Sequence, residues 1–327
     1  MAIPKSFRKK LLISVGLGGI AFFVLALLPD RQEILEAGKT FAWRWMPIAL
    51  GCALLNYVIR CVRWVWYLRI LEIPVRLKES IPIFLIGLML SATPGKAGEL
   101  FKSYLLKIAC GARMSRTAPV VVVERLTDMT GMLILASIGL LVIDVRRELV
   151  YLLWAVIGVG LVVLSSKRLV HFFLEHTHGL LSERMIERLE HAYDSLSTLI
   201  TLPRLLTATL MSAVAWFSEC VSLMVILHGF GTVCTWIEAT FIYSVSTLAG
   251  AALFFMPGGI GGTEAAMVSM LREIAGATEA VASLATVLTR AVTLWFAVII
   301  GLVALFFCPF EIAEDVESEI EHAKDEL

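Results

Sequence analysis

Apolar residues run along this chain in long stretches and not in the short alternation typical of β-strands. A helix needs about 20 predominantly apolar residues to cross a bilayer. Six stretches approach or exceed that length, and each predicts a spanning helix: near 11–28, 45–68, 117–143, 149–166, 205–228 and 280–308. The pattern therefore predicts an all-α polytopic membrane protein.

Two further apolar stretches, 81–109 and 237–271, are each interrupted by Pro and Gly beside a Glu. The first interruption reads Pro94-Gly95-Lys96-Ala97-Gly98-Glu99, and the second reads Pro257-Gly258-Gly259-Ile260-Gly261-Gly262-Thr263-Glu264. Half a span, a break and another half-span are typical of a re-entrant helical hairpin. Irregular backbone survives at membrane depth only inside protein or along a water-filled cavity, so each break also marks a candidate site.

Composition narrows the class of protein. Of the 327 residues, 58% are hydrophobic and only 17% are charged, against about 25% charged in an average soluble domain. Polar residues are too few to cover a soluble globule of this size, which excludes a soluble enzyme, a nucleic-acid-binding module and a disordered chain. We expect one integral membrane domain over residues 1–310, followed by an acidic cytosolic tail over 311–327.

Basic residues predict the orientation, because cytosolic loops of membrane proteins carry an excess of Lys and Arg. With both termini in the cytosol and both broken stretches as hairpins, cytosolic segments hold 19 bases and external segments hold six. The first hairpin then lies on the cytosolic side and the second on the outer side. No cleavage site follows the first span, so we expect a retained anchor in a prokaryotic inner (cytoplasmic) membrane.

The two broken stretches belong to a longer internal repeat. Glu99 to Arg125 and Glu264 to Arg290 are both separations of 26 residues, and each arginine lies in the helix after the break. The units read span, hairpin, span over about 45–143 and 205–308, and the charge count makes them enter from opposite faces. This is the pattern of an inverted-topology repeat, in which the substrate site lies near the midplane between discontinuous helices.

Charges within apolar stretches need an explanation, because each costs about 2.5–3.5 kcal/mol at the bilayer centre. Arg125 and Arg290 are suited to hold an anionic headgroup through forked hydrogen bonds. Glu99 and Glu264 would pair with these arginines in the empty state or carry protons. The candidate substrate-binding set also includes the remaining charges and the break glycines: Lys96, Glu124, Asp128, Gly95, Gly98, Gly258 and Gly261. The alternative is that the two Glu–Arg pairs are fixed structural ties.

Four further features carry weaker signals. Arg60, Arg63, Trp64, Trp66, Tyr67 and Arg69 read as an aromatic and basic anchor at the cytosolic interface. Asn56 would hydrogen-bond either into the cavity or to a neighbouring helix, and Glu219 is a lone acid in a span and a candidate proton carrier. Residues 171–200 are expected to form an amphipathic surface helix, since their four histidines match no strong metal-site spacing.

Motifs of the main catalytic classes are absent from the sequence. It has no Walker loop, no nucleophile elbow and no zinc-binding helix motif. We therefore expect no enzyme, no cofactor and no metal site.

Three motifs taken in order resemble a known family. They are Ala92-Thr93-Pro94-Gly95-Lys96-Ala97-Gly98-Glu99-Leu100, Val123-Glu124-Arg125-Leu126-Thr127-Asp128 and Pro257–Glu264. The chain resembles the flippase-like membrane domain of the lysylphosphatidylglycerol synthase superfamily from about residue 10 to 308. In bifunctional members that domain flips an aminoacylated lipid made by an attached cytosolic synthase. We expect this chain to work without such a synthase, because only the 17 residues 311–327 follow its membrane domain. The resemblance to stand-alone members implies handling of polyprenyl-phosphate sugars, hopanoids or other lipids.

Two functions follow from these features. The first is a lipid translocase that moves an anionic or phosphate-bearing lipid through a polar groove between the two hairpins. The alternative is a non-transporting membrane scaffold for a lipid-linked glycosyltransferase or a lipid-synthesis enzyme. In both cases the expected partners are a membrane lipid with an anionic headgroup and such an enzyme, and not nucleic acid.

Overall fold

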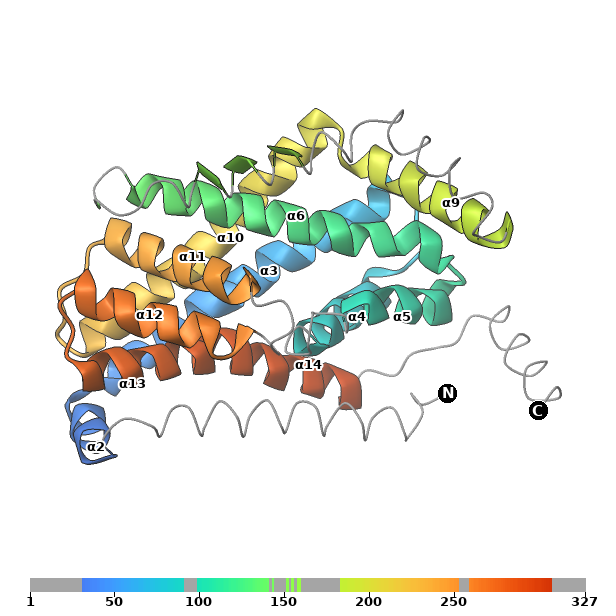
Figure 1. Cartoon of the computed structure of the whole chain (residues 1–327). Coiled ribbons are helices and arrows are strands. Elements are labelled where there is room, and N and C mark those ends of the chain that lie inside the picture. The colour runs from blue at the N-terminus through green and yellow to red at the C-terminus, as the bar shows by residue number, and fades with distance from the viewer. Residues whose placement is uncertain are drawn as a thin grey trace.

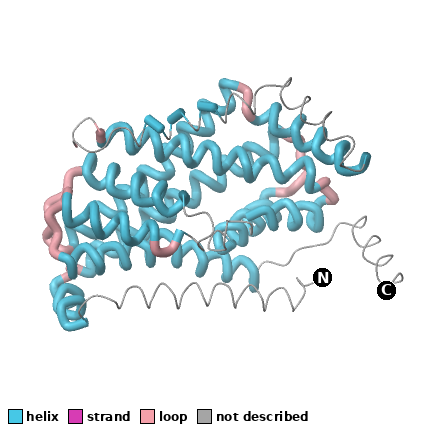
Figure 2. The backbone as a smooth tube through the Cα atoms, in the orientation of Figure 1, coloured by secondary structure: helices cyan, strands magenta, loops and turns pink. Residues whose placement is uncertain are grey.

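A computed structural model describes residues 31–90, 99–140, 143, 151–152, 154–155, 158–159, 183–252 and 259–307. Every regular element in those ranges is a helix, and short loops lie mostly at the two ends of the bundle (Figures 1 and 2). The all-α prediction is confirmed for this part of the chain. The predicted span 11–28, most of 149–166, the tail 311–327 and the Pro-Gly segments 91–98 and 253–258 lie outside it.

Four long helical runs coincide with predicted spans. They are α3 (Met46–Ile70), α6 (Met114–Gly139), α10 (Leu202–Gly229) and the run α13 (Glu279–Arg290), η4 (Ala291–Trp295) and α14 (Phe296–Phe307). Three of them are long and apolar enough to cross a membrane: Trp43–Ile70, Leu202–Gly229 and Glu279–Phe306. Helix α6 has 26 residues, about 39 Å at 1.5 Å per residue, but it carries charges at its middle.

Each broken stretch forms two shorter helices that pack on each other. The first pair is α4 (Leu77–Leu90) with α5 (Phe101–Cys110), and the second is α11 (Trp236–Ala252) with α12 (Gly262–Glu273). The second pair is in very close contact, because a Cβ atom added at Gly250 would lie 1.9 Å from Thr263 Oγ1. The helical pairs are thus confirmed, and their re-entry within the membrane stays a prediction.

The contacts between the two units follow a reciprocal pattern. Helix α6 of the first unit packs on α11 of the second, and α14 of the second packs on α4 of the first. Helices α3 and α10 pack side by side, and Asn56, Ser218 and Ser222 bond to backbone carbonyls across them. The start of α3 meets the end of α10 through Ala42 N–H to Gly229 O at 2.9 Å. These helices are therefore antiparallel, as an inverted repeat requires, and the pairs α4–α5 and α11–α12 lie at opposite ends of the bundle in Figure 1.

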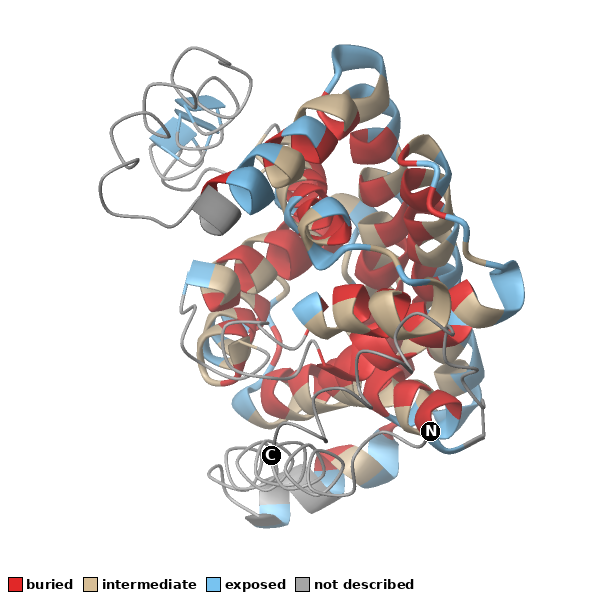
Figure 3. Cartoon of the chain, turned by 90° about the vertical axis from the view of Figure 1, so that its right-hand side faces the viewer, coloured by how far each residue is buried: buried red, intermediate tan, exposed pale blue. Residues whose placement is uncertain are grey.

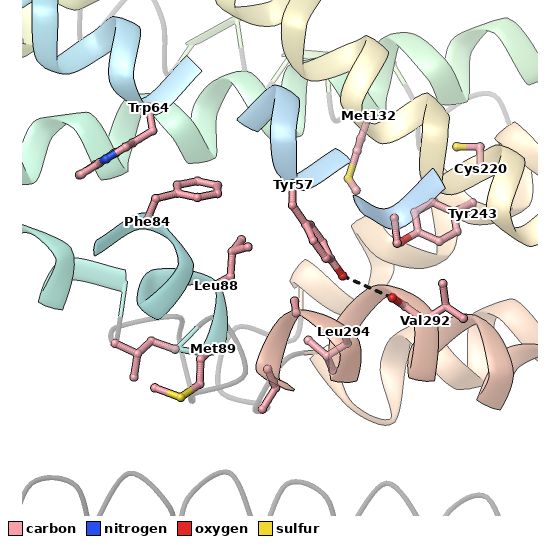
Figure 4. Packing of buried hydrophobic residues seen from close by; sticks show 14 of the residues in the cluster. Tyr57, Trp64, Phe84, Leu88, Met89, Met132, Cys220, Tyr243, Val292 and Leu294 are labelled. Atoms are coloured by element: carbon pink, nitrogen blue, oxygen red, sulfur yellow. Dashed lines mark hydrogen bonds between the residues drawn. The ribbon is translucent and has the colours of Figure 1, made fainter. Parts of the chain in front are cut away.

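The buried side chains follow the centre of this bundle. Figure 3 shows the buried residues gathered where the helices face one another, with exposed residues on the outside. In Figure 4 Tyr57 of α3 points toward η4, where its hydroxyl donates to the carbonyls of Thr293 at 2.6 Å and Val292 at 3.3 Å. A π-turn frees such carbonyls from the α-helical ladder, and Tyr57 satisfies them.

Three further elements precede the long helices α3 and α10. Helix α2 (Arg31–Thr40) and η1 (Trp43–Trp45) precede α3, and α9 (Glu183–Leu199) precedes α10. Helix α9 buries Ile186 and Tyr193 and exposes Glu187 to Glu190. An amphipathic helix is thus confirmed for residues 183–199, and its position on the cytosolic surface stays a prediction. Residues 171–182 lie outside the described ranges.

Candidate functional site

The first predicted Glu–Arg pair is present. Arg125 Nε of α6 lies 3.0 Å from Glu99 Oε2, at the start of the helix that follows the first Pro-Gly segment. The Glu99 side chain is 3% exposed and that of Arg125 is 23% exposed. A buried carboxylate and a partly open guanidinium leave the arginine as the member of the pair that an incoming anion can reach.

The second predicted pair is also present, in the corresponding place of the second unit. Arg290 Nε at the end of α13 lies 2.7 Å from Glu264 Oε1. The other oxygen, Glu264 Oε2, accepts the backbone N–H of Gly261 at 2.6 Å. Gly261 has φ +93°, which only glycine adopts without strain, and this lets the backbone turn back toward the carboxylate. The break thereby positions Glu264 for Arg290.

Asp128 of α6 contacts more cationic side chains than the sequence indicated. Its carboxylate lies 2.7 Å from Arg63 Nη2, 3.0 Å from Arg125 Nη2 and 3.7 Å from Arg60 Nη2. Ser212 of α10 donates a further hydrogen bond at 2.7 Å. Asp128 thus ties α6 to α3 and α10, and it links the Glu99–Arg125 pair to two other arginines.

The interpretation of 60–69 as an interfacial anchor is wrong for most of its members. Arg63, Trp64 and Tyr67 are fully buried, and Arg60 is 8% exposed. Residues at i, i+3, i+4 and i+7 share one helix face, so Arg60, Arg63, Trp64 and Tyr67 form one stripe that faces the interior. That spacing was the signal for a buried stripe, and only Trp66 and Arg69 keep an outward or half-buried position.

A third ion pair was missed from the sequence. Lys102 Nζ of α5 lies 2.5 Å from Glu124 Oε2 of α6, and both side chains are at most 4% exposed. The same nitrogen lies 4.4 Å from the centre of the Trp64 ring, a cation–π contact. Lys102 was counted among the cytosolic bases, because no local pattern separates it from its basic neighbours. Glu124 therefore pairs with Lys102 and not with the Asp128 cluster, although both acids lie on one side of α6.

Glu219 of α10 has a different kind of partner. Its carboxylate is buried, and its Oε2 accepts a hydrogen bond from the hydroxyl of Tyr243 on α11. Asn56 of α3 donates to the carbonyl of Ala215 at 2.9 Å, so its amide serves as a contact between α3 and α10.

The structure thus brings seven of the predicted and newly found charged residues into contact with one another in the interiors of the two units. Glu99, Arg125 and Asp128 are connected, Glu124 joins Lys102, and Glu264 joins Arg290 and Gly261. Gly95, Lys96, Gly98 and Gly258 fall outside the described residues. Within the described ranges no group of three His, Cys, Asp or Glu side chains is placed to hold a metal ion.

A hollow of about 420 Å³ lies away from these charges, beside α9. Its lining includes Arg113, Arg116, His191 and Asp194, and Arg113 Nη1 lies 3.3 Å from His191 Nε2. It belongs to the surface between α9 and the α5–α6 loop, and none of the predicted site residues lines it.

The fold and the buried charges define the class of protein. Apolar helices long enough to cross a membrane enclose charged groups that no lipid-facing surface could hold, so this is an integral membrane protein with a polar interior. A family model described as the lysylphosphatidylglycerol synthase TM region matches residues 10–301. The chain belongs to that family.

One curated relative is also named a membrane protein. The chain is similar to a UPF0104 membrane protein of Methanothermobacter thermautotrophicus (strain ATCC 29096 / DSM 1053 / JCM 10044 / NBRC 100330 / Delta H). The two are 20% identical over 336 residues, which cover 95% of this chain and 98% of the relative. The family model over residues 10–301 confirms the assignment made from the three motifs for nearly the whole chain.

Proposed function

We propose that this protein is a lipid translocase that moves an anionic or phosphate-bearing lipid across the membrane. The observation that carries the proposal is the matched pair of buried contacts, Glu99–Arg125 and Glu264–Arg290, one beside each break of the repeat. An arginine that is paired with an internal carboxylate can release that carboxylate and bind an anionic headgroup in its place.

The interior charges suggest how this exchange works. Arg125 contacts both Glu99 and Asp128, so it can leave Glu99 for a headgroup while Asp128 keeps it in place. Arg290 offers the same exchange with Glu264 in the second unit. Alternating opening of the α4–α5 and α11–α12 pairs would pass the headgroup between the two arginines, while the lipid tails remain in the bilayer.

The proposed setting is a prokaryotic inner membrane with both termini in the cytosol. The excess of Lys and Arg on one side supports that orientation. No sequence feature points to catalysis, so we propose a transporter and not an enzyme.

The test is lipid movement by purified protein in phosphatidylcholine vesicles that carry fluorescent phosphatidylglycerol. Arg125→Ala and Arg290→Ala should each slow the movement by roughly 10- to 100-fold, since a charged hydrogen bond contributes about 1.5–3 kcal/mol. Arg272→Ala is the matched control, because its side chain is 52% exposed and pairs with Glu279 on the surface. Wild-type rates in both interior variants would contradict the proposal.

The alternative is a non-transporting scaffold for a lipid-linked glycosyltransferase or lipid-synthesis enzyme. The exposed residues 187–190 of α9 and the hollow beside that helix favour a docking surface there. The stripe of Arg60, Arg63 and Trp64 cannot contribute to it, because these side chains are buried. Protein that moves no lipid but co-purifies tightly with one such enzyme would support the scaffold.

A further inference from the structure

We propose that Glu219 is a proton-binding site that couples headgroup movement to the co-transport of one proton. The coupling rests on the proposed lipid translocation, whereas the proton site rests only on the surroundings of Glu219. The first is tested by transport and the second by spectroscopy, so the two can fail separately.

The location of Glu219 is unusual for an ionised group. It lies within the candidate span Leu202–Gly229 and is 3% exposed. Its carboxylate accepts the Tyr243 hydroxyl of α11, a neutral donor. None of the ion pairs of the described residues includes Glu219, so Arg60 and Arg290 act on it only from beyond contact distance. Burial of a carboxylate without a cation in contact is very costly, so the neutral carboxylic acid is the form that this site favours.

The other interior carboxylates give the contrast. Glu99 lies 3.0 Å from Arg125, Glu124 lies 2.5 Å from Lys102, and Asp128 lies 2.7 Å from Arg63. Glu264 lies 2.7 Å from Arg290. Among the interior carboxylates of the described ranges, these four each form an ion pair with Lys or Arg. Glu219 is the one that forms none.

The charge balance links this site to the headgroup. Five cations and five carboxylates lie in the interior of the described ranges: Arg60, Arg63, Lys102, Arg125 and Arg290, with Glu99, Glu124, Asp128, Glu219 and Glu264. With Glu219 ionised these charges sum to zero, and with Glu219 protonated they sum to +1. Among these ten described groups, one bound proton thus leaves one positive charge, which matches a singly charged headgroup such as a phosphodiester.

Glu219 is also placed to compete with the headgroup for arginines of both units. The charged and titratable groups that interact electrostatically with it are Tyr57 and Arg60 of α3, Asp128 of α6, Tyr243 of α11, Arg290 of α13 and Cys220 of its own helix. Protonation of Glu219 removes one negative charge near Arg60 and Arg290, while Arg60 keeps its contact with Asp128 and Arg290 its pair with Glu264. An incoming anion then meets one competing carboxylate fewer. Loss of the proton on the alkaline side restores the carboxylate charge near these arginines and releases the headgroup.

Glu219→Gln is a mild substitution for testing the acid. Glutamine has nearly the same size as glutamate, and its side-chain oxygen can still accept the hydrogen bond from Tyr243. It cannot bind or release a proton, so it removes the acid alone.

The proton site is tested by infrared difference spectroscopy of the purified protein in phosphatidylcholine vesicles across a pH titration. The wild-type protein should show the C=O stretch of a buried carboxylic acid at neutral pH, and Glu219→Gln should lose that band. Glu279→Gln, whose side chain is 61% exposed, should keep it. A band that is absent from the wild type, or unchanged in Glu219→Gln, would overturn the proton site.

The coupling is tested in the same vesicles with fluorescent phosphatidylglycerol and a pH gradient of one unit. Movement of one proton with one anion is electroneutral, so the lipid should accumulate about tenfold in the leaflet on the alkaline side. A membrane potential should not change this distribution in the wild type. Glu219→Gln would move the anion without a proton, so it should distribute the lipid evenly across the pH gradient and should respond to a membrane potential. If the wild-type protein shows the infrared band but distributes the lipid evenly, the coupling is overturned. If the wild-type protein moves no lipid at all, translocation itself is overturned, and the proton site is unaffected.

Discussion

At the scale of single residues, the interior is organised by carboxylates that hold arginines in place. The Glu99–Arg125 and Glu264–Arg290 pairs were predictable, because equal spacing from two similar breaks placed them at equivalent positions. The contacts of Arg63 with Asp128 and of Lys102 with Glu124 were not, since they join separate helices at separations of 65 and 22 residues. Only packing of α3, α5 and α6 brings these groups together.

Asp128 is the residue with the largest expected effect on stability. Asp128→Asn would leave Arg60 and Arg63 without a carboxylate and weaken the hold on Arg125. Removing one partner from a buried ion pair costs about 3–5 kcal/mol. We therefore expect a large fall in the midpoint of thermal unfolding in mild detergent.

Asp194→Asn serves as the control for this change, because Asp194 lies on the exposed side of α9. It should leave the unfolding midpoint nearly unchanged. Combining Asp128→Asn with Arg63→Gln should recover part of the loss, since the double variant buries one cation fewer. Equal midpoints for Asp128→Asn and the wild type would contradict the role of Asp128 as the centre of this cluster.

At the scale of elements, the breaks act by bringing short helices into close contact. In α11 and α12 the backbone at Gly250 approaches Thr263, and the turn at Gly261 directs its N–H to Glu264. The sequence predicted a break here from its Pro and Gly residues. It did not predict that Gly250, inside a regular helix, is required by the approach of the next helix.

Gly250→Ala should weaken the contact between α11 and α12. Its Cβ atom would meet Thr263 Oγ1 at 1.9 Å, and overpacking of this kind costs about 1–3 kcal/mol. Gly51→Ala in α3 is the matched control, since a Cβ atom there has nothing within 4 Å. Helical Gly→Ala in open space stabilises by about 0.5–1 kcal/mol, so the two unfolding midpoints should move in opposite directions. A shift of both in the same direction would argue against the close contact.

At the scale of the whole molecule, helices of each unit pack on helices of the other unit around the antiparallel pair α3 and α10. Helices α3 and α10 run in opposite directions, α6 packs on α11, and α14 packs on α4. Corresponding loops of the two units therefore lie at opposite ends of the bundle (Figure 2). Each Glu–Arg pair therefore has a counterpart in the other unit, held by helices that run in the opposite direction.

Opposite exposure of corresponding loops is directly testable. Glu72 follows α3, and Val233, 89% exposed, follows α10. In a variant without the six native cysteines, Glu72→Cys should react with an impermeant thiol reagent only from the cytosolic side. Val233→Cys should react only from the outer side. Labelling of both from one side would contradict the inverted arrangement.

The sequence by itself determined the membrane class, the family, the positions of four long helical runs and the two Glu–Arg pairs. Apolar length, Pro-Gly breaks and equal spacing are local or regularly repeated features, so they can be read along the chain. The tertiary structure alone decided that Arg63 and Lys102 are interior and that Asp128 joins three arginines. It also left Glu219 facing a tyrosine and not a cation. These contacts depend on which helix faces meet, and that is fixed by packing between segments far apart in the sequence.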